Sequence, residues 1–141
     1  MLAFALAFAL SQPSTYPGLC RAAPRGWLEQ TDAIRGMLIV NHVNLYHDGS
    51  LHWNGTAVAR GDVARFVGIT SRMRPAPPTI LTVEYGTSCD DVAAVRSMIF
   101  KQGNCASSQK CVDAGGVAKF DPEAERLTVP RPPAPPAMRR R

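Results

Sequence analysis

The order of apolar patterns between residues 37 and 104 is the feature that most constrains how this chain folds. The run MLIVNHVNLY (37–46) is rich in β-branched and apolar residues, which is typical of a strand. Asp48-Gly49 follows it and is a strong hairpin-turn signal, because these residues tolerate positive φ. The short run LHW (51–53) then predicts a second strand.

The register of this hairpin follows from its apolar residues. A three-residue loop over residues 48–50 pairs Leu45 with Trp53 and His47 with Leu51. With that loop four apolar side chains share one side of the sheet: Val43, Leu45, Leu51 and Trp53. A two-residue loop would divide these side chains between the two faces, so we expect the longer loop.

A helix and a third strand come next. Residues 62–73 carry apolar residues at helical spacing, with Asp62 as the expected N-cap. The predicted buried face consists of Val63, Phe66, Val67, Thr70 and Met73. Prolines end this helix, and TILTVEY (79–85) then predicts a strand. Its alternation places Leu81, Val83 and Tyr85 on one face and Ile80 on the other.

A second helix is expected to begin at Ser88. Ser88 and Asp91, three residues later, form a start that resembles a capping box. The predicted buried stripe consists of Val92, Val95, Met98 and Ile99. Gly103 and Asn104 end the helix, and a last short strand is expected either at Val112 or over residues 117–120. The sequence therefore predicts an α+β fold with a small sheet of three to four strands and two helices packed on one face.

The composition changes sharply at both ends of this domain. Residues 12–36 are rich in proline and glycine, which predicts a linker before a domain over residues 37–120. Residues 121–141 form a proline- and arginine-rich tail, expected to be disordered. Residues 1–11 contain ten apolar residues, fewer than the ~20 that span a bilayer.

The apolar start matches the central region of a signal peptide. Ala9 and Ser11 would be the small residues before cleavage near Gln12. No basic residue precedes the run, so a truncated membrane segment and a disordered apolar terminus stay open as alternatives. We expect a periplasmic or secreted protein, with anchoring to the inner membrane left open.

The positive charge of the chain lies largely in its tail. The net charge is +5, yet Arg131 and residues 139–141 supply four of the positive charges. The rest of the chain is close to neutral and shows no clustered basic stretch of the kind that binds nucleic acid. We therefore expect no nucleic-acid partner.

Four cysteines are the candidate disulfide residues: Cys20, Cys89, Cys105 and Cys111. Their even number and the lack of a CxxC pair favour disulfides over zinc. Cys89 and Cys105 bracket one helix and would lie ~24 Å apart, too far for a bond. Cys20–Cys89 with Cys105–Cys111 is the preferred pairing, and a Cys89–Cys111 bond is the alternative. Four reduced cysteines in a cytoplasmic protein are a third interpretation.

Two clusters could carry chemistry, and neither is the preferred interpretation. In the expected register His47 faces away from His42 and His52, and those two lie roughly 13 Å apart. We expect solvent-facing strand histidines and no metal. Cys89 stands beside Ser88 and two aspartates at the start of a helix. A helix N-terminus favours a thiolate, but capping and a disulfide explain this cluster better. We therefore expect no catalytic residues, no cofactor and no enzyme activity.

The stretch over residues 37–104 resembles the periplasmic domain of the ExbD/TolR family of biopolymer transport proteins. The resemblance rests on MLIVNHVNLY, DGSLHWNGTAV, DVARFVGITSRM and PAPPTILTVEYGTSCDDVAAVRSMI, followed by Gly103. The family shares the order of a strand, a DG…NG hairpin, a helix, a strand and a helix ending in glycine. Its transmembrane helix carries an ion-conducting aspartate. The apolar start here has no aspartate, so no such residue is carried over.

The resemblance implies a non-catalytic periplasmic protein that binds other proteins or the cell envelope in energy-coupled transmembrane transport. The implied partner is an envelope protein such as a membrane motor subunit, and a homodimer stays open. The alternative is a free secreted, disulfide-stabilised binding or inhibitor-like module. The sheet edge and the proline-rich tail are the expected contact elements, through strand addition or polyproline docking.

Overall fold

The structure is a computed structural model and describes residues 14–18, 20–29, 39–121 and 123. The strands among them are β1 (Leu28–Glu29), β2 (Asn41–Leu45), β3 (Leu51–Trp53), β4 (Thr56–Val58), β5 (Thr79–Glu84) and β6 (Cys111–Val117). The helices are α2 (Arg60–Thr70), α3 (Cys89–Gln102) and α4 (Cys105–Ser108). The α+β class is confirmed. The described sheet has six strands, so the expected three to four was too low.

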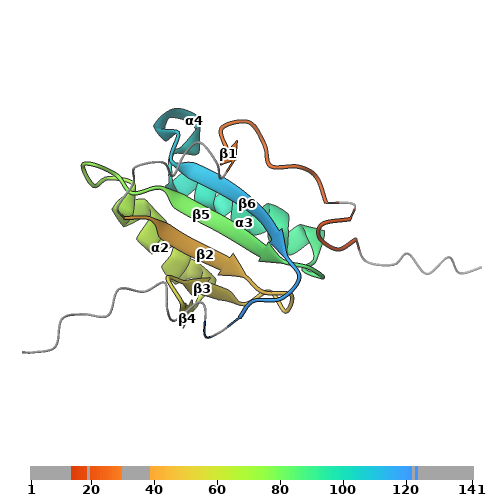
Figure 1. Cartoon of the computed structure of the whole chain (residues 1–141). Helices are drawn as coiled ribbons and strands as arrows, with labels where there is room; N and C mark the ends of the chain where they lie inside the picture. Colours follow the sequence, from red (N-terminus) through yellow and green to blue (C-terminus); the bar gives the residue numbers. More distant parts are fainter. Residues whose placement is uncertain (1–13, 19, 30–38, 122, 124–141) are drawn as a thin grey trace, which may run out of the picture.

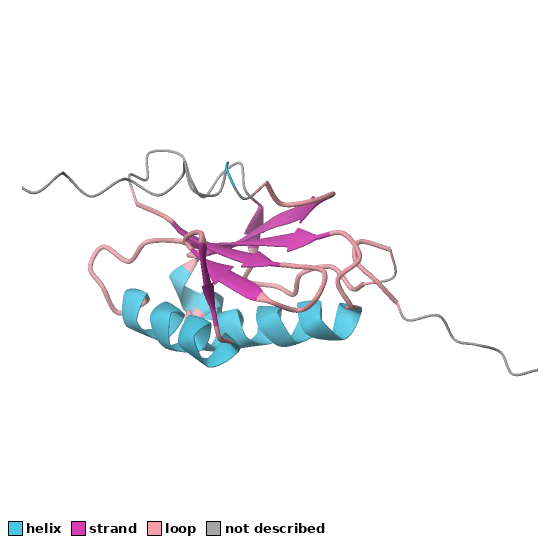
Figure 2. Cartoon of the chain, turned by 90° about the horizontal axis from the view of Figure 1, so that it is seen from below, coloured by secondary structure: helices cyan, strands magenta, loops and turns pink. Residues whose placement is uncertain are grey.

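The sheet is mixed, with the order β1-β6-β5-β2-β3-β4 (Figure 1). β2, β5, β6 and β1 run parallel, whereas β2, β3 and β4 form an antiparallel meander. Helices α2 and α3 provide the crossovers that parallel neighbours require. Both lie on the same face of the sheet, as the sequence predicted (Figure 2).

The hydrophobic core lies between this face and the two helices. The buried members are Val43, Leu45, Leu51, Val63, Val67, Leu81, Val83, Val92, Val95, Ile99, Cys105 and Cys111. The predicted buried faces of both helices and the predicted inward faces of β2, β3 and β5 are therefore largely right. Met73 is an exception, because α2 ends at Thr70 and leaves the Met73 side chain 51% exposed. Tyr85 follows the end of β5 and is 47% exposed.

The hairpin register differs from the expected one by two residues. Leu45 pairs with Leu51, and Val43 pairs with Trp53. The three-residue loop therefore covers residues 47–49, with Gly49 at φ 84°, where a left-handed residue closes the turn. A shift of two residues preserves the period-2 alternation, so the faces were predicted correctly although the partners were not.

The Asn54-Gly55 turn begins a strand that the sequence analysis missed. Both residues have positive φ (47° and 84°), as a two-residue type I′ hairpin requires. This turn returns the chain as β4, which pairs with β3 and forms one edge of the sheet. The residues TAV carry no large apolar or aromatic pair of the kind that marked LHW as a strand, and Thr56 and Ala57 are exposed.

The two helix starts differ from each other. Helix α3 begins as predicted, because the Ser88 hydroxyl accepts a hydrogen bond from the Asp91 amide at 3.1 Å. Helix α2 begins two residues earlier than predicted. Ala59 is its N-cap, and Asp62 lies in the first turn, 3.2 Å from Arg65 Nη2, so the expected Asp62 cap was wrong.

The expected linker over residues 12–36 is in part a component of the domain. Residues 28–29 form β1 beside β6, Thr15 bridges to Ser88, and Cys20 is bonded to Cys89. The expected domain start at residue 37 was therefore too late. Residues 1–11 and almost all of the expected tail lie outside the described residues. Within the described part, no helix has the length and apolarity to cross a membrane.

Glycine at position 103 is required for close packing at the end of α3. A Cβ on Gly103 would lie 2.8 Å from Ile99 O, 3.1 Å from Cys111 Sγ and 3.3 Å from Val67 Cγ1. We expect Gly103→Ala to lower the free energy of unfolding by about 1–3 kcal/mol in urea titrations.

Gly61→Ala is the matched control, because nothing lies within 4 Å of a Cβ at this helical position. It should raise stability by up to about 1 kcal/mol. Equal effects of the two substitutions would contradict the packing argument.

Candidate functional site

Two disulfides join Cys20 to Cys89 and Cys105 to Cys111, with Cα–Cα distances of 5.0 and 5.4 Å. This is the pairing preferred from the sequence, and no cysteine is free. Structural disulfides persist in oxidising compartments, so the pair indicates an extracytoplasmic environment. Because Cys89 is bonded, it is no free nucleophile in this state.

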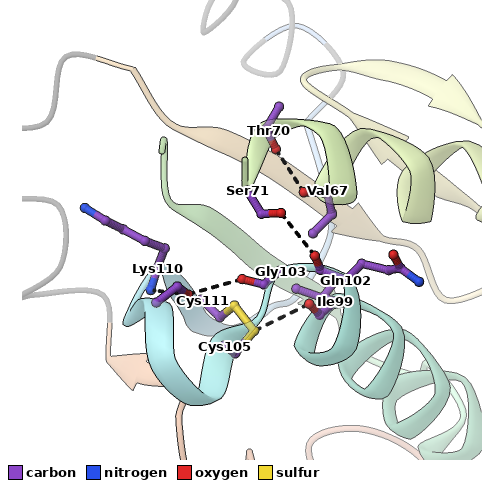
Figure 3. The surroundings of a disulfide bond; sticks show 10 residues. Val67, Thr70, Ser71, Ile99, Gln102, Gly103, Cys105, Lys110 and Cys111 are labelled. Carbon is purple, nitrogen blue, oxygen red and sulfur yellow. Dashed lines mark hydrogen bonds between the residues drawn. A yellow bond between two sulfur atoms is a disulfide. The ribbon is translucent and has the colours of Figure 1, made fainter. Parts of the chain in front are cut away.

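The Cys105–Cys111 disulfide is part of the core. Both residues are buried, with exposures of 0% and 1%, and Cys105 Sγ lies 3.4 Å from Ile99 O. Figure 3 shows this bond beside the end of α3, where the Ser71 hydroxyl donates to Gln102 O at 3.2 Å. The bond therefore attaches the start of β6 to the helix layer and has a structural role.

The Cys20–Cys89 disulfide attaches a different segment. Residues 14–18 and 20–24, here called the N-terminal strap, lie across the start of α3. The Tyr16 amide donates to Thr87 O at 2.7 Å, and Tyr16 O accepts from the Gly86 amide at 2.9 Å. The Cys89 amide donates to Ser14 O at 3.0 Å. Three backbone hydrogen bonds and one disulfide therefore hold the strap on the domain.

A buried ion pair also holds the strap on the domain. Arg96 on α3 donates to Asp113 Oδ2 on β6 through Nη2 at 2.7 Å and Nε at 3.0 Å. The remaining guanidinium nitrogen, Nη1, donates to Arg21 O at 2.7 Å. The side chains of Arg96 and Asp113 are only 8% and 11% exposed. Burial and the nearby Asp113 carboxylate raise the pKa of Tyr16, whose ring lies 6.0 Å from the Arg96 guanidinium.

Sequence reasoning missed this ion pair. Arg96 follows Val92 by four residues and Val95 by one, so it lies at the border of the buried stripe, where a charged side chain is normally solvated. The only available signal was Asp113 directly after the apolar Val112, since a carboxylate in a central strand needs a cation.

A groove of about 650 Å³ lies between the strap and α3. Its lining comes from both segments: Ser14, Cys20, Arg21, Ala22, Pro24, Cys89, Asp90, Val92, Ala93, Arg96, Ser97 and Phe100. The volume falls in the range of small-molecule and peptide sites. The groove holds no histidine, and of its two arginines Arg96 is paired with Asp113. The disulfide is its most reactive chemical group.

The three histidines have different environments. His47 Nδ1 lies 3.2 Å from Oε1 of Glu84, whose side chain is buried. His52 stacks on Tyr46 with ring centroids 4.4 Å apart. His42 is half-buried, so it is not the solvent-facing residue that we expected. Its strand neighbour Ile80 is buried on the same side of the sheet.

The observed register also changes the histidine spacing. His52 lies opposite Asn44, so it is two residues from His42 across the hairpin, roughly 7 Å, and the expected 13 Å was wrong. Within the described ranges no group of three His, Cys, Asp or Glu side chains could hold a metal ion.

The cluster at the start of α3 is a capping and ion-pair site. The Ser88 hydroxyl donates to Asp91 Oδ2 at 2.9 Å, and Arg60 Nη2 donates to Asp91 Oδ1 at 2.9 Å. The hydrogen bonds from Arg60 and then Ser88 lower the pKa of Asp91. This geometry caps the helix and joins α2 to α3.

No protein-family model, curated protein or solved structure matches this chain.

Replacing Arg96 with methionine should destabilise the fold, because Asp113 would keep a buried charge without its partner. We expect Arg96→Met to cost about 3–5 kcal/mol in urea unfolding with the disulfides intact. The control Lys101→Met lies on the exposed side of the same helix and should change stability by less than about 0.5 kcal/mol. Similar midpoints for both variants would contradict a structural role for the pair.

Burial lowers the pKa of His42 below its usual value, so the folded protein favours the neutral ring. Between the folded and unfolded pKa values the unfolded chain binds more protons, and stability therefore rises with pH. We expect stability to fall as pH drops below about 6.5. In His42→Gln the loss in urea midpoint between about pH 7.5 and 5.5 should be smaller. An unchanged loss would assign the effect to other groups.

Proposed function

We propose that this protein is a non-catalytic periplasmic binding module, similar to the ExbD/TolR domain, that contributes to energy-coupled transport. It acts by pairing its β4 edge with an extended segment of a protein in the cell envelope, such as a membrane motor subunit. The observation that carries this proposal is the exposed β4 edge.

The chemistry of the edge supports strand addition. Among the described strands β4 is last in the sheet order and pairs with β3 alone, and its residues Thr56 and Ala57 are exposed. Trp53 and Thr56 flank the two-residue turn and hydrogen-bond to each other, so the backbone N–H and C=O of Ala57 point away from β3. Such unpaired groups are a template for another strand.

Two further features support the proposal. The order of strand, hairpin, helix, strand and helix, on which the resemblance rests, is also the order of these elements in the fold. The two disulfides suit the periplasm. Attachment to the inner membrane, through a segment outside the domain, belongs to the same proposal. Pairing of two β4 edges would give the homodimer that the sequence analysis left open.

A free secreted, disulfide-stabilised binding or inhibitor-like module is the second candidate. Its support is that two disulfides and the groove occur in one small domain. Fractionation of the native host separates the candidates, because a free module is released with the soluble fraction whereas a motor-associated protein sediments with the membranes.

The edge is tested by photo-crosslinking in the native host. We expect a photoreactive phenylalanine analogue at Ala57 to form an adduct with an inner-membrane protein, identified by mass spectrometry, or with a second copy of this chain. The same analogue at Ala94, exposed on α3, is the positional control and should give neither adduct.

A pair of backbone variants then tests the mechanism of pairing. Ala57→Pro removes the outward amide and should reduce the adduct formed from Thr56 at least about tenfold, whereas Ala57→Thr keeps the amide and the adduct. Equal adducts from positions 57 and 94, or equal yields from the two variants, would overturn the proposal.

A further inference from the structure

The two disulfides of this protein differ in their surroundings. Cys105 and Cys111 are buried in the core. Cys20 and Cys89 are half-buried and line the groove between the strap and α3. Thiol–disulfide exchange requires a thiolate to reach one sulfur along the S–S axis, so access distinguishes the two bonds. The groove provides this access to the Cys20–Cys89 bond.

The position of Cys89 also makes it a good leaving group. Cys89 is the first residue of the 14-residue helix α3, where the helix dipole and free amides stabilise a thiolate. The carboxylate of Asp90 beside it opposes this effect but is exposed and therefore screened. Asp91 is neutralised by Arg60, 2.9 Å away. Arg21 beside Cys20 adds a positive charge at the groove.

We propose that the Cys20–Cys89 disulfide is a site of reversible thiol–disulfide exchange with a dithiol oxidoreductase. The reductant's thiolate enters through the groove and attacks Cys20 Sγ, the S–S bond breaks, and Cys89 leaves as the thiolate. The second thiol of the reductant then attacks its own sulfur in the mixed disulfide and displaces Cys20. The oxidoreductase departs as a disulfide, and this chain holds two thiols.

The consequence of exchange is a loosened strap. The disulfide spans 69 residues, and once it is open the strap keeps its hydrogen bonds to Thr87, Gly86, Cys89 and Arg96 and the ring contacts of Tyr16. Three of these are single backbone bonds outside the regular ladder of the sheet, and such bonds open more readily than those of the core strands. Exchange therefore frees the groove and the start of α3 while β5 and β6 stay folded. This switch uses no residue of the β4 edge, so it stands apart from the proposed binding function.

The first test measures which disulfide opens. The full chain is treated with reduced dithiothreitol under native conditions, quenched with N-ethylmaleimide and mapped by mass spectrometry. We expect Cys20 and Cys89 to be labelled at least about tenfold faster than Cys105 and Cys111. Labelling of all four cysteines at one rate, or only after unfolding, would overturn the proposal.

The second test identifies the attacked sulfur. A thioredoxin whose second active-site cysteine is replaced by alanine is used as a trap for the mixed disulfide. We expect the adduct at Cys20, in the native chain and in the double variant Cys105→Ala/Cys111→Ala, and none in Cys20→Ala/Cys89→Ala. Circular dichroism verifies that each variant is folded. Adducts at Cys105 or Cys111, or none in the native chain, would contradict the assignment.

Hydrogen exchange tests whether the strap loosens when the bond opens. An accessible disulfide that did not control the strap would leave this exchange unchanged. After selective reduction, the amides of Tyr16, Gly86 and Cys89 should exchange at least about tenfold faster, while those of β5 keep their protection. Unchanged exchange at these three amides would show that the strap does not respond to the bond, which would overturn the proposed switch.

Discussion

The buried ion pair of Arg96 and Asp113 connects three parts of this protein that are distant in sequence. It joins α3 to β6 and, through Arg21 O, to the N-terminal strap. A charge in this position is tolerated only because all of its partners are satisfied within the fold. The strap, the groove and the half-buried disulfide all depend on this arrangement. Arg96 lines the groove and donates a hydrogen bond to Arg21 O of the strap.

The two disulfides hold different parts of the structure: one lies in the packed core, and the other attaches the strap, which we propose is released when that bond opens. Cys105–Cys111 lies inside the packed layer of α3, α4 and β6, where Gly103 leaves room for it (Figure 3). Cys20–Cys89 attaches the strap, whose residues Tyr16 and Cys20 are only partly buried against the core. The β4 edge lies at the opposite side of the sheet order from β6 and β1. The two proposed activities therefore occupy separate surfaces of one domain.

Local patterns predicted the elements whose signals are local. The Ser88 cap, the stripe of Val92, Val95 and Ile99, and the strand before it depend on neighbours within a few residues, and the structure contains them. The hairpin faces were predicted for the same reason. The partners within the hairpin were not, because a shift of two residues leaves the alternation unchanged. β4 and β1 were missed because their short segments carry no alternation of large apolar side chains, so only the strand beside them defines them.

The sequence by itself determined the α+β class, the buried side of each element that it predicted, and the exclusion of a Cys89–Cys105 bond by helix length. The choice between the two remaining disulfide pairings needed the structure. Only the tertiary structure decided that residues before position 37 join the sheet, that Arg96 is buried, and that the two disulfides differ in exposure. These features arise from contacts between residues as far as 75 positions apart, which no local periodicity encodes. The free energies of these contacts depend on desolvation in the assembled core rather than on residue type alone.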